Sequence, residues 1–176
     1  MVQGNTAKVP APPPPANTPA NLSADYLYQT DFYAWTQQQA ALLRDRNWHN
    51  IDLANLIEEI ESLGKQQRQE LRNRLGILLG HLLKWEYQPS RRSRSWLATL
   101  RVQRRDLDKL LQENPSLKPY LDEAMQVAYE NARDLAMGET NLPAETFPVD
   151  CPYSINDTLA GRFYPGDPSD LIEEAE

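Results

Sequence analysis

The sequence predicts an all-α protein, an up-and-down bundle of four to five helices. The helix formers Leu, Ala, Glu, Gln and Arg dominate its 176 residues, whereas the β-branched residues that favour strands are few. Apolar residues make up 40% of the chain and recur at three- and four-residue spacing in successive segments. Short breaks separate these segments, and short connections favour antiparallel neighbouring helices.

Three parts are expected along the chain. Residues 1–24 are a lead that holds six prolines, four of them consecutive, and proline has no amide hydrogen to donate. We therefore predict that this lead is extended and disordered. Residues 25–165 are predicted to form the helical bundle domain. Residues 166–176 form an acidic tail that is expected to fray.

The first two helices are predicted from their capping residues. Asp31 is the expected N-cap of a helix that runs to about Arg46, and residues 47–50 form a break. Asp52 is the expected N-cap of the second helix. The apolar side of this second helix is expected to face the core, and its members are Leu53, Leu56, Ile57, Ile60 and Leu63. Gly64 is predicted to end or kink the helix, and the sequence leaves open which.

Three longer helices and an irregular C-terminal segment follow. Helices are predicted over 65–87, from the region 90–93 to 114, and over 116–137, with Pro89, Pro115 and Gly138 marking their ends. The rest of the chain is expected to wrap around the bundle and to include a short helix over 154–160. Its aromatic side chains are expected to fix it to the bundle, namely Phe147, Tyr153 and Phe163.

Charge is distributed unevenly. The net charge of −7 argues against nucleic acid, yet residues 65–105 hold eleven Lys or Arg against two acids, or +9, which leaves −16 for the rest. We expect acidic side chains of the same chain to neutralise most of these cations. The alternative is a nucleic-acid-binding module, in which Trp85, Tyr87 and Trp96 stack on bases between the cations.

A group of hydroxyls and arginines near the start of a predicted helix is a candidate anion site. Its members are Ser90, Arg91, Arg92, Ser93, Arg94 and Ser95. A helix N-terminus already carries partial positive charge, so three arginines there favour an anion beside them. That anion is either internal, from Glu58, Glu59 or Glu61, or an external phosphate; we favour the internal reading.

Polar residues on predicted core faces are the second set of candidates. They are Gln39, Glu59, Arg74, His81, Gln103, Arg104 and Asn131. A buried amide without partners costs about 1–3 kcal/mol, so such residues must be paired. One reading is a polar layer that fixes the helix register, which we favour. The other is a ligand cleft, which would suit an enzyme with its site near His81 and Gln103.

The sequence offers little for metal or covalent chemistry. Cys151 is the single cysteine, and neither of the two histidines follows a Glu at the spacing of a bundle metal site. We expect no metal site, no cofactor and no catalytic role for Cys151. No signal peptide is expected, and the richest apolar segment, residues 77–85, is too short to span a membrane. These features favour a cytoplasmic protein without a membrane partner.

Four runs resemble a known family. They are DFYAWTQQQAALLR (31–44), NLIEEIESLGKQQRQELRNRL (55–75), HLLKWEYQPSRRSRSWLATLRVQRRDL (81–107) and FPVDCPYS (147–154). Together they resemble the bacterial, largely cyanobacterial, domain-of-unknown-function family 29, over about residues 25–165. The resemblance implies a small helical protein, and it carries no established activity or catalytic residue.

These observations favour a protein-interaction or regulatory module over an enzyme. Helices of mixed charge and the lack of a converging catalytic constellation support this hypothesis. We expect a protein partner. Nucleic-acid binding through residues 65–105 is the second hypothesis, and an enzyme with a polar cleft is the third. The sequence does not predict an oligomeric state.

Overall fold

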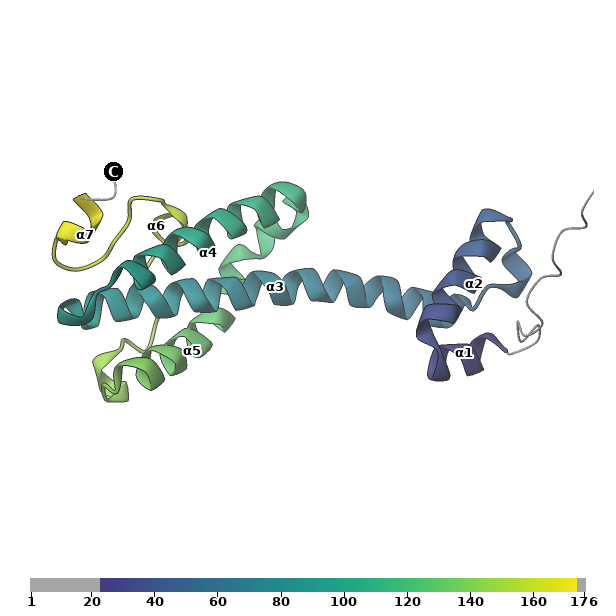
Figure 1. The fold of residues 1–176 in the computed structure, drawn as a ribbon, viewed down its shortest axis with the longest axis horizontal. Helices are drawn as coiled ribbons and strands as arrows, with labels where there is room; N and C mark the ends of the chain where they lie inside the picture. Colours follow the sequence, from purple (N-terminus) through teal and green to yellow (C-terminus); the bar gives the residue numbers. More distant parts are fainter. Residues whose placement is uncertain (1–22, 174–176) are drawn as a thin grey trace, which may run out of the picture. The chain divides into compact units, whose positions relative to one another are not determined.

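The computed structural model describes residues 23–173, and all regular elements among them are helical (Figure 1), which confirms the all-α class. The contacts divide the chain into two compact units: unit 1 extends to Ile60 and unit 2 begins at Glu61. The predicted boundaries, with one bundle domain over 25–165 between a lead and a tail, stay a prediction. Residues 1–22 of the predicted proline-rich lead lie outside the described residues.

Unit 1 comprises α1 (Ala24–Thr30), α2 (Phe32–Arg44) and the start of α3 (Leu53–Tyr87), with a 3-10 turn over Trp48–Asn50. The hydroxyl of Ser23 and the carboxylate of Asp31 accept the amide hydrogens of Tyr26 and Ala34, so they cap α1 and α2. The predicted cap at Asp31 is confirmed. Helix α1 has only seven residues beside a proline-rich stretch, and the sequence analysis missed it.

Polar contacts attach α1 and α2 to the start of α3. Trp35 is buried, and its indole Nε1 donates to the carboxylate of Asp52 at 3.1 Å. The backbone amide of Asp52 donates to the buried Gln39 side chain at 2.8 Å, and the Tyr28 hydroxyl donates to Glu59 at 2.7 Å. Hydrogen bonds, in addition to the aromatic packing of Tyr28, Phe32 and Trp35, therefore hold unit 1 together.

Helix α3 runs for 35 residues without interruption through Gly64. The predicted end of a helix at Gly64 is therefore wrong, and the two helices predicted around it are one. A glycine inside a helix costs about 1 kcal/mol relative to alanine. The good helix formers on both sides of Gly64 outweigh that cost.

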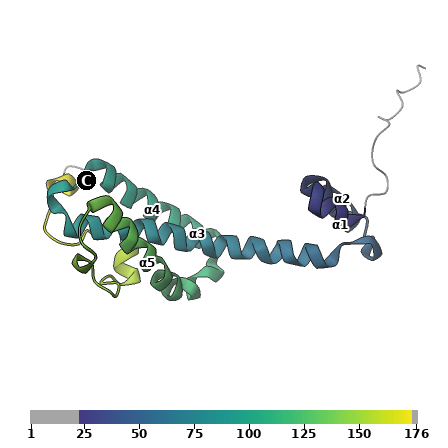
Figure 2. The same cartoon turned by 90° about the horizontal axis from the view of Figure 1, so that it is seen from below.

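Unit 2 packs α4 (Arg94–Glu113) and α5 (Leu121–Thr140) against the C-terminal half of α3 (Figures 1 and 2). Successive helices alternate in direction, so α4 is antiparallel to α3 and α5 runs parallel to it. The connections are 3-10 turns over Pro89–Arg91 and Pro115–Tyr120. The leucines of α3 from 71 to 83 are fully buried and form the centre of the core. The up-and-down order predicted for the three long helices is therefore present within this unit.

The buried face of α5 differs from the prediction. Small residues fill it at four-residue spacing, at positions 124, 128, 132 and 136, and Val127 and Asn131 are exposed. The helix also continues past Gly138 to Thr140 and ends at Asn141, whose φ of 57° is left-handed. The placement of Asn131 in the core is thus wrong, because the alanine row and its larger neighbours Met125 and Tyr129 form the buried face of α5.

Two glycines of α3 allow α5 to approach closely. A Cβ atom on Gly80 would lie 2.6 Å from Cδ2 of Leu135 and 3.2 Å from the carbonyl oxygen of Ala132. On Gly76 it would lie 3.4 Å from the carbonyl oxygen of Ala128. Because Gly76 and Gly80 have no side chains, α3 and α5 can pack closely at these positions.

The C-terminal segment packs against unit 2, as predicted. Phe147 and Tyr153 are buried, and Phe163 packs against the core. Ser154 caps α6 (Ile155–Leu159) by accepting the amide hydrogen of Asp157 at 3.1 Å. The predicted frayed tail holds a short helix, α7 (Asp170–Glu173), whose Leu171 and Ile172 contact the core. That part of the tail prediction is corrected, and residues 174–176 lie outside the described chain.

Candidate functional site

The six residues predicted as an anion site do not form one cradle. Ser93 is the N-cap of α4: its Oγ accepts the amide hydrogen of Trp96 at 3.3 Å and lies 2.8 Å from Oγ of Ser95. Ser90, Arg91 and Arg94 are exposed, and Arg92 is directed to the C-terminal segment. The capping hydroxyl of Ser93 thus already satisfies an amide that an anion would bind.

Arg92 binds backbone carbonyls. Its Nε donates to the carbonyl of Trp85 at 2.7 Å, and Nη1 donates to the carbonyl of Asp167 at 2.7 Å. The guanidinium also lies 5.0 Å from the Trp85 ring centroid. Burial lowers the pKa of Arg92, and the charges of Asp167 and Glu86 oppose this. For Arg92, the expected neutralisation by carboxylates of the second helix is therefore wrong.

Arg104 has the same kind of role deeper in unit 2. Only 6% of the residue is exposed. Its Nε and Nη2 donate to the carbonyls of Thr158 and Phe163 at 3.0 and 2.5 Å, and Nη1 lies 3.4 Å from the carbonyl of Gly161. Burial lowers the pKa of Arg104, and its interactions with Tyr164 oppose this. Arg104 fastens the chain around α6 to α4, so its donors are occupied.

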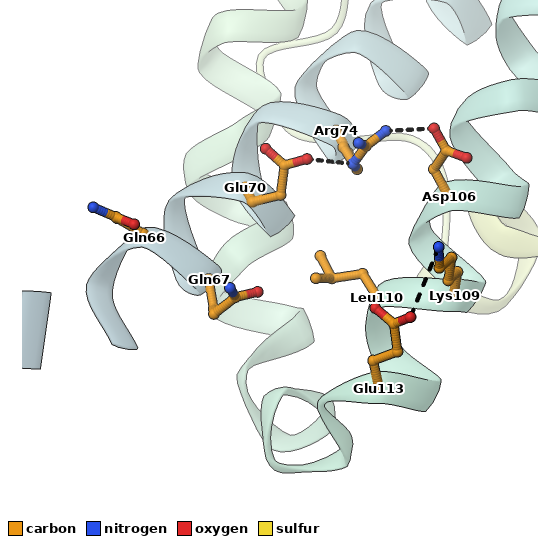
Figure 3. A pocket seen from close by; sticks show the side chains of 8 residues that line it. All are labelled: Gln66, Gln67, Glu70, Arg74, Asp106, Lys109, Leu110 and Glu113. Carbon is orange, nitrogen blue, oxygen red and sulfur yellow. Dashed lines mark hydrogen bonds and ion pairs between the residues drawn. The ribbon is translucent and has the colours of Figure 1, made fainter. Parts of the chain in front are cut away.

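Arg74 lies in a polar cleft between α3 and α4 of about 610 Å³ (Figure 3). Its Nε donates to Glu70 at 2.6 Å, and Nη1 donates to Asp106 at 2.7 Å. The lining residues are Gln66, Gln67, Glu70, Arg74, Asp106, Lys109, Leu110 and Glu113. Lys109 pairs with Glu113 at 3.8 Å, so both cations of the cleft have carboxylate partners. This cleft is the nearest match to the predicted ligand site, yet both of its cations already have carboxylate partners within it.

A buried lysine was missed by the sequence analysis. Lys84 is 2% exposed, forms an ion pair with Glu139 and lies 4.3 Å from the Trp96 ring centroid. A signal was present, because Lys84 stands between Leu83 and Trp85 in the most apolar stretch of the chain. A lysine is almost never fully buried unless it is paired, so that position predicts an internal acidic partner.

His81 lies one turn before Lys84 at the edge of the core. Its Nδ1 is 3.0 Å from the carbonyl oxygen of Ile77, which fits the expected hydrogen-bonded histidine. Burial, and then the charge of Lys84, lower the pKa of His81 from its ordinary 6.5. The neutral imidazole is therefore the form that the folded chain favours.

Replacing His81 with glutamine is expected to flatten the pH dependence of stability. Because the pKa of His81 is lower in the folded than in the unfolded chain, the unfolded chain binds more protons below pH 6.5. Stability should thus fall as the pH drops through 6.5 in the natural chain, and less so in H81Q. Denaturation midpoints at about pH 7.5 and about pH 5.5 measure the difference. Equal slopes in both chains would contradict the assignment.

The remaining polar candidates are dispersed. Gln39 and Glu59 serve unit 1, where the bond from Asp52 to Gln39 supports the register reading. In unit 2, Oε1 of Gln103 is buried without a hydrogen-bond partner among the described residues, and Asn131 is exposed. Neither His81 nor Gln103 lines the cleft around Arg74 or the recess beside Cys151. The set does not converge on one cleft, and a catalytic constellation is not assembled from it.

Cys151 is a half-buried thiol. Its Sγ lies 3.6 Å from the carbonyl oxygen of Tyr153, and burial raises the pKa of Cys151. It lines a recess of about 460 Å³ together with Tyr129, whose pKa burial raises to about 12. A thiol that is harder to ionise is a poorer nucleophile, so the surroundings of Cys151 do not activate it.

An apolar row on α3 that was predicted to be buried is exposed. Leu53, Ile57 and Ile60 were expected to face the core, yet they are 61%, 48% and 61% exposed. Helices α1 and α2 are bonded to Asp52 and Glu59, on another side of α3. The described residues therefore leave about half or more of each of these three side chains exposed. Leu63, on the next turn of α3, is also 60% exposed.

The fold and these sites define a small all-helical protein whose buried Lys84 and Arg104 have partners within the fold, and which carries an exposed apolar row. Within residues 23–173, no helix has both the length and the apolar character needed to cross a membrane. The chain belongs to the family described as Domain of unknown function DUF29, whose family model matches residues 27–164. Neither a curated protein nor a solved structure matches the chain.

Proposed function

We propose that this chain is a protein-interaction module and that the apolar row Leu53, Ile57 and Ile60 is its binding face. The exposure of these three side chains, at four- and three-residue spacing on one helix, carries the proposal. Single exposed apolar residues are common, but an aligned group is typical of an interaction site. Burying three such side chains in a partner contributes about 1.5–3 kcal/mol each before the costs of association.

Site-directed photo-crosslinking in the native host tests this proposal. A photoreactive phenylalanine analogue at position 57 is expected to give a discrete adduct with another protein. The same analogue at position 149, an exposed valine of unit 2, is the matched control. The substitutions Leu53→Ser and Ile60→Ser should abolish the adduct at 57, because they remove apolar contact area without touching the interior. An adduct that survives these substitutions, or one that is equal at position 149, would contradict the proposal.

A second candidate function is nucleic-acid binding through α4. Arg94, Arg101 and Arg105 are exposed and lie seven and four residues apart, so they follow one face of the helix. Four cations of the 65–105 segment are directed into the fold, since Arg74 and Lys84 pair with carboxylates and Arg92 and Arg104 bind carbonyls. The basic region that this candidate could use is therefore narrower than the whole segment. A cytoplasmic setting remains a prediction for either function.

Fluorescence anisotropy with single-stranded and duplex oligonucleotides tests this second candidate. Binding should weaken steeply between about 50 and about 200 mM salt. It should also be lost in the double variant Arg101→Glu and Arg105→Glu. An absence of binding at the lower salt concentration would reject nucleic-acid recognition.

A further inference from the structure

We propose that unit 2 binds the phosphate group of a small phosphorylated organic molecule beside Arg68 and Arg72 of α3. The proposal does not depend on the apolar row, because the residues that carry it belong to another unit of the chain. It rests on two features: a pair of arginines that are held in place without a carboxylate, and a recess beside the first of them.

One tyrosine holds the two arginines. The guanidinium of Arg68 lies 4.8 Å from the centroid of the Tyr120 ring, and Nη1 of Arg72 donates to the Tyr120 hydroxyl at 2.6 Å. Nη2 of Arg72 donates to the side-chain oxygen of Gln69, also at 2.6 Å. Tyr120 is part of the buried core, so its ring fixes the place of both guanidinium groups. Two like charges are thereby held beside one side chain.

Among the described residues, neither of these arginines has a carboxylate partner. This distinguishes them from Arg74, the next arginine of α3, which pairs with Glu70 and Asp106. Two guanidinium groups beside one side chain repel each other, and an anion near both would remove that repulsion. The hydroxyl hydrogen of Tyr120 also has no acceptor in the described part of the chain. Donors and positive charge therefore meet at this point of unit 2.

A phosphate group suits this pair better than a carboxylate does. A phosphomonoester carries about −1.5 to −2 charge at neutral pH and has three acceptor oxygens. It can therefore accept from two guanidinium forks and balance both charges. Lys65 stands three residues before Arg68, so it lies on the same side of α3 and adds a third cation. Its pair with Glu61, at 4.0 Å between exposed side chains, is of little value and leaves the ammonium able to turn.

A recess of about 480 Å³ beside Arg68 has room for the organic part of such a ligand. Lys65 and Arg68 line it from α3, and Ser116 and Leu117 line it from the 3-10 turn between α4 and α5. Ser116 is exposed and offers a hydroxyl, whereas the buried Leu117 offers an apolar surface. Volumes of this size and mixed linings of this kind are typical of small-molecule sites.

A small ligand fits these surroundings better than a nucleic-acid strand does. Gln67 lines both this recess and the cleft around Arg74, so the two adjoin (Figure 3). That cleft holds three carboxylates against two cations, namely Glu70, Asp106 and Glu113 against Arg74 and Lys109. A phosphate backbone that continued past Gln67 would meet these carboxylates, and like charges there would oppose binding.

Titration of the full chain with phenyl phosphate, followed by two-dimensional amide NMR spectra at constant ionic strength, tests the inference. At about pH 7.5 this probe is a dianion, because the second pKa of a phosphomonoester is about 6. Isophthalate, an aromatic dicarboxylate, is the control for charge, and inorganic phosphate is the control for the organic part. Phenyl phosphate is expected to bind at least about tenfold more tightly than either control and to shift the amide signals of residues 65–72 and 116–120.

Three variants locate the binding. Arg68→Gln and Arg72→Gln should each weaken the binding of phenyl phosphate at least about tenfold, because each removes a charged donor. Arg105→Gln, at an exposed arginine of α4, should change it by less than about twofold. Circular dichroism checks that the variants fold. Arg68 is exposed, so R68Q keeps the test valid even if the loss of the bond from Arg72 to Tyr120 unfolds R72Q.

Four results would overturn the inference. The first is an absence of phenyl phosphate binding at millimolar concentrations. The second is equal binding of isophthalate, or equal losses in R68Q and R105Q, which would show general charge attraction. The third is inorganic phosphate that binds as tightly as phenyl phosphate, which would leave the recess without a role. The fourth is a single-stranded oligonucleotide that binds more tightly than phenyl phosphate and is weakened by R68Q, which would assign the arginines to nucleic acid.

Discussion

Replacing Arg104 with alanine is expected to destabilise unit 2 by about 3 kcal/mol. The substitution leaves the carbonyls of Thr158 and Phe163 without their charged donor and removes the contact with the Tyr164 ring. A hydrogen bond to a charged group contributes about 1.5–3 kcal/mol, and burial keeps water from replacing the donor fully. The segment around α6 should therefore loosen first. Hydrogen exchange of residues 155–164 and chemical denaturation followed by circular dichroism measure both effects.

Arg105 provides the matched control on the same helix. Its side chain is 74% exposed and lies 3.9 Å from the carboxylate of Asp106, an ion pair of little value in water. Arg105→Ala should change stability by less than about 0.5 kcal/mol. Arg104→Lys should rescue only part of the loss, because an ammonium cannot present the planar fork of a guanidinium. Equal effects of R104A and R105A would show that the carbonyl contacts contribute nothing.

Local features of the fold could be predicted from the sequence. The caps at Asp31, Asp52, Ser93 and Ser154 are formed by residues within three or four positions of the helix starts. The all-α class follows from propensities and spacing, which are also local. Apolar spacing identified the row at Leu53, Ile57 and Ile60 as one helix face. It could not show whether another element covers that face, and the structure leaves the row exposed.

The partners of the buried charges could not be predicted, because they lie far away in the sequence. Arg104 binds carbonyls 54 to 59 residues later, and Lys84 pairs with Glu139 at a separation of 55. Any of several acids could have neutralised the cations of residues 65–105 on sequence grounds. Charge counting gave the correct expectation for Lys84 and Arg74. It missed the hydrogen-bond partners of Arg92 and Arg104, since backbone carbonyls carry no formal charge to count.

Two glycines of α3 also show that residue type alone does not predict a role that depends on distant parts of the chain. Gly64 and Gly80 both lie inside α3, and residue type alone assigns both a cost of about 1 kcal/mol relative to alanine. Their surroundings differ, because no atom lies within 4 Å of a Cβ built on Gly64, whereas one built on Gly80 meets α5. The helix-breaking role assigned to Gly64 thus came from its residue type, and the packing role of Gly80 needs the tertiary structure.

Replacing Gly80 with valine is expected to destabilise unit 2 by about 3 kcal/mol. The new Cβ would lie 2.6 Å from Cδ2 of Leu135, which can move, and 3.2 Å from the carbonyl oxygen of Ala132, which belongs to the backbone of α5. The two further methyl groups of valine find no space unless α5 shifts. Gly80→Ala should cost less, since the side chain of Leu135 can rotate away and alanine gains helix propensity.

Gly64→Ala is the control that makes this result interpretable. It adds the same Cβ to the same helix where no atom lies within 4 Å, so it should stabilise α3 by about 1 kcal/mol. Denaturation followed by circular dichroism gives both free energies of unfolding, and hydrogen exchange along residues 53–87 shows where each change acts. If G64A destabilises the chain, Gly64 does not lie in a continuous helix. If G80V is tolerated as well as G64A, α3 and α5 do not approach as closely as the alanine row requires, and the packing of unit 2 must differ from that described.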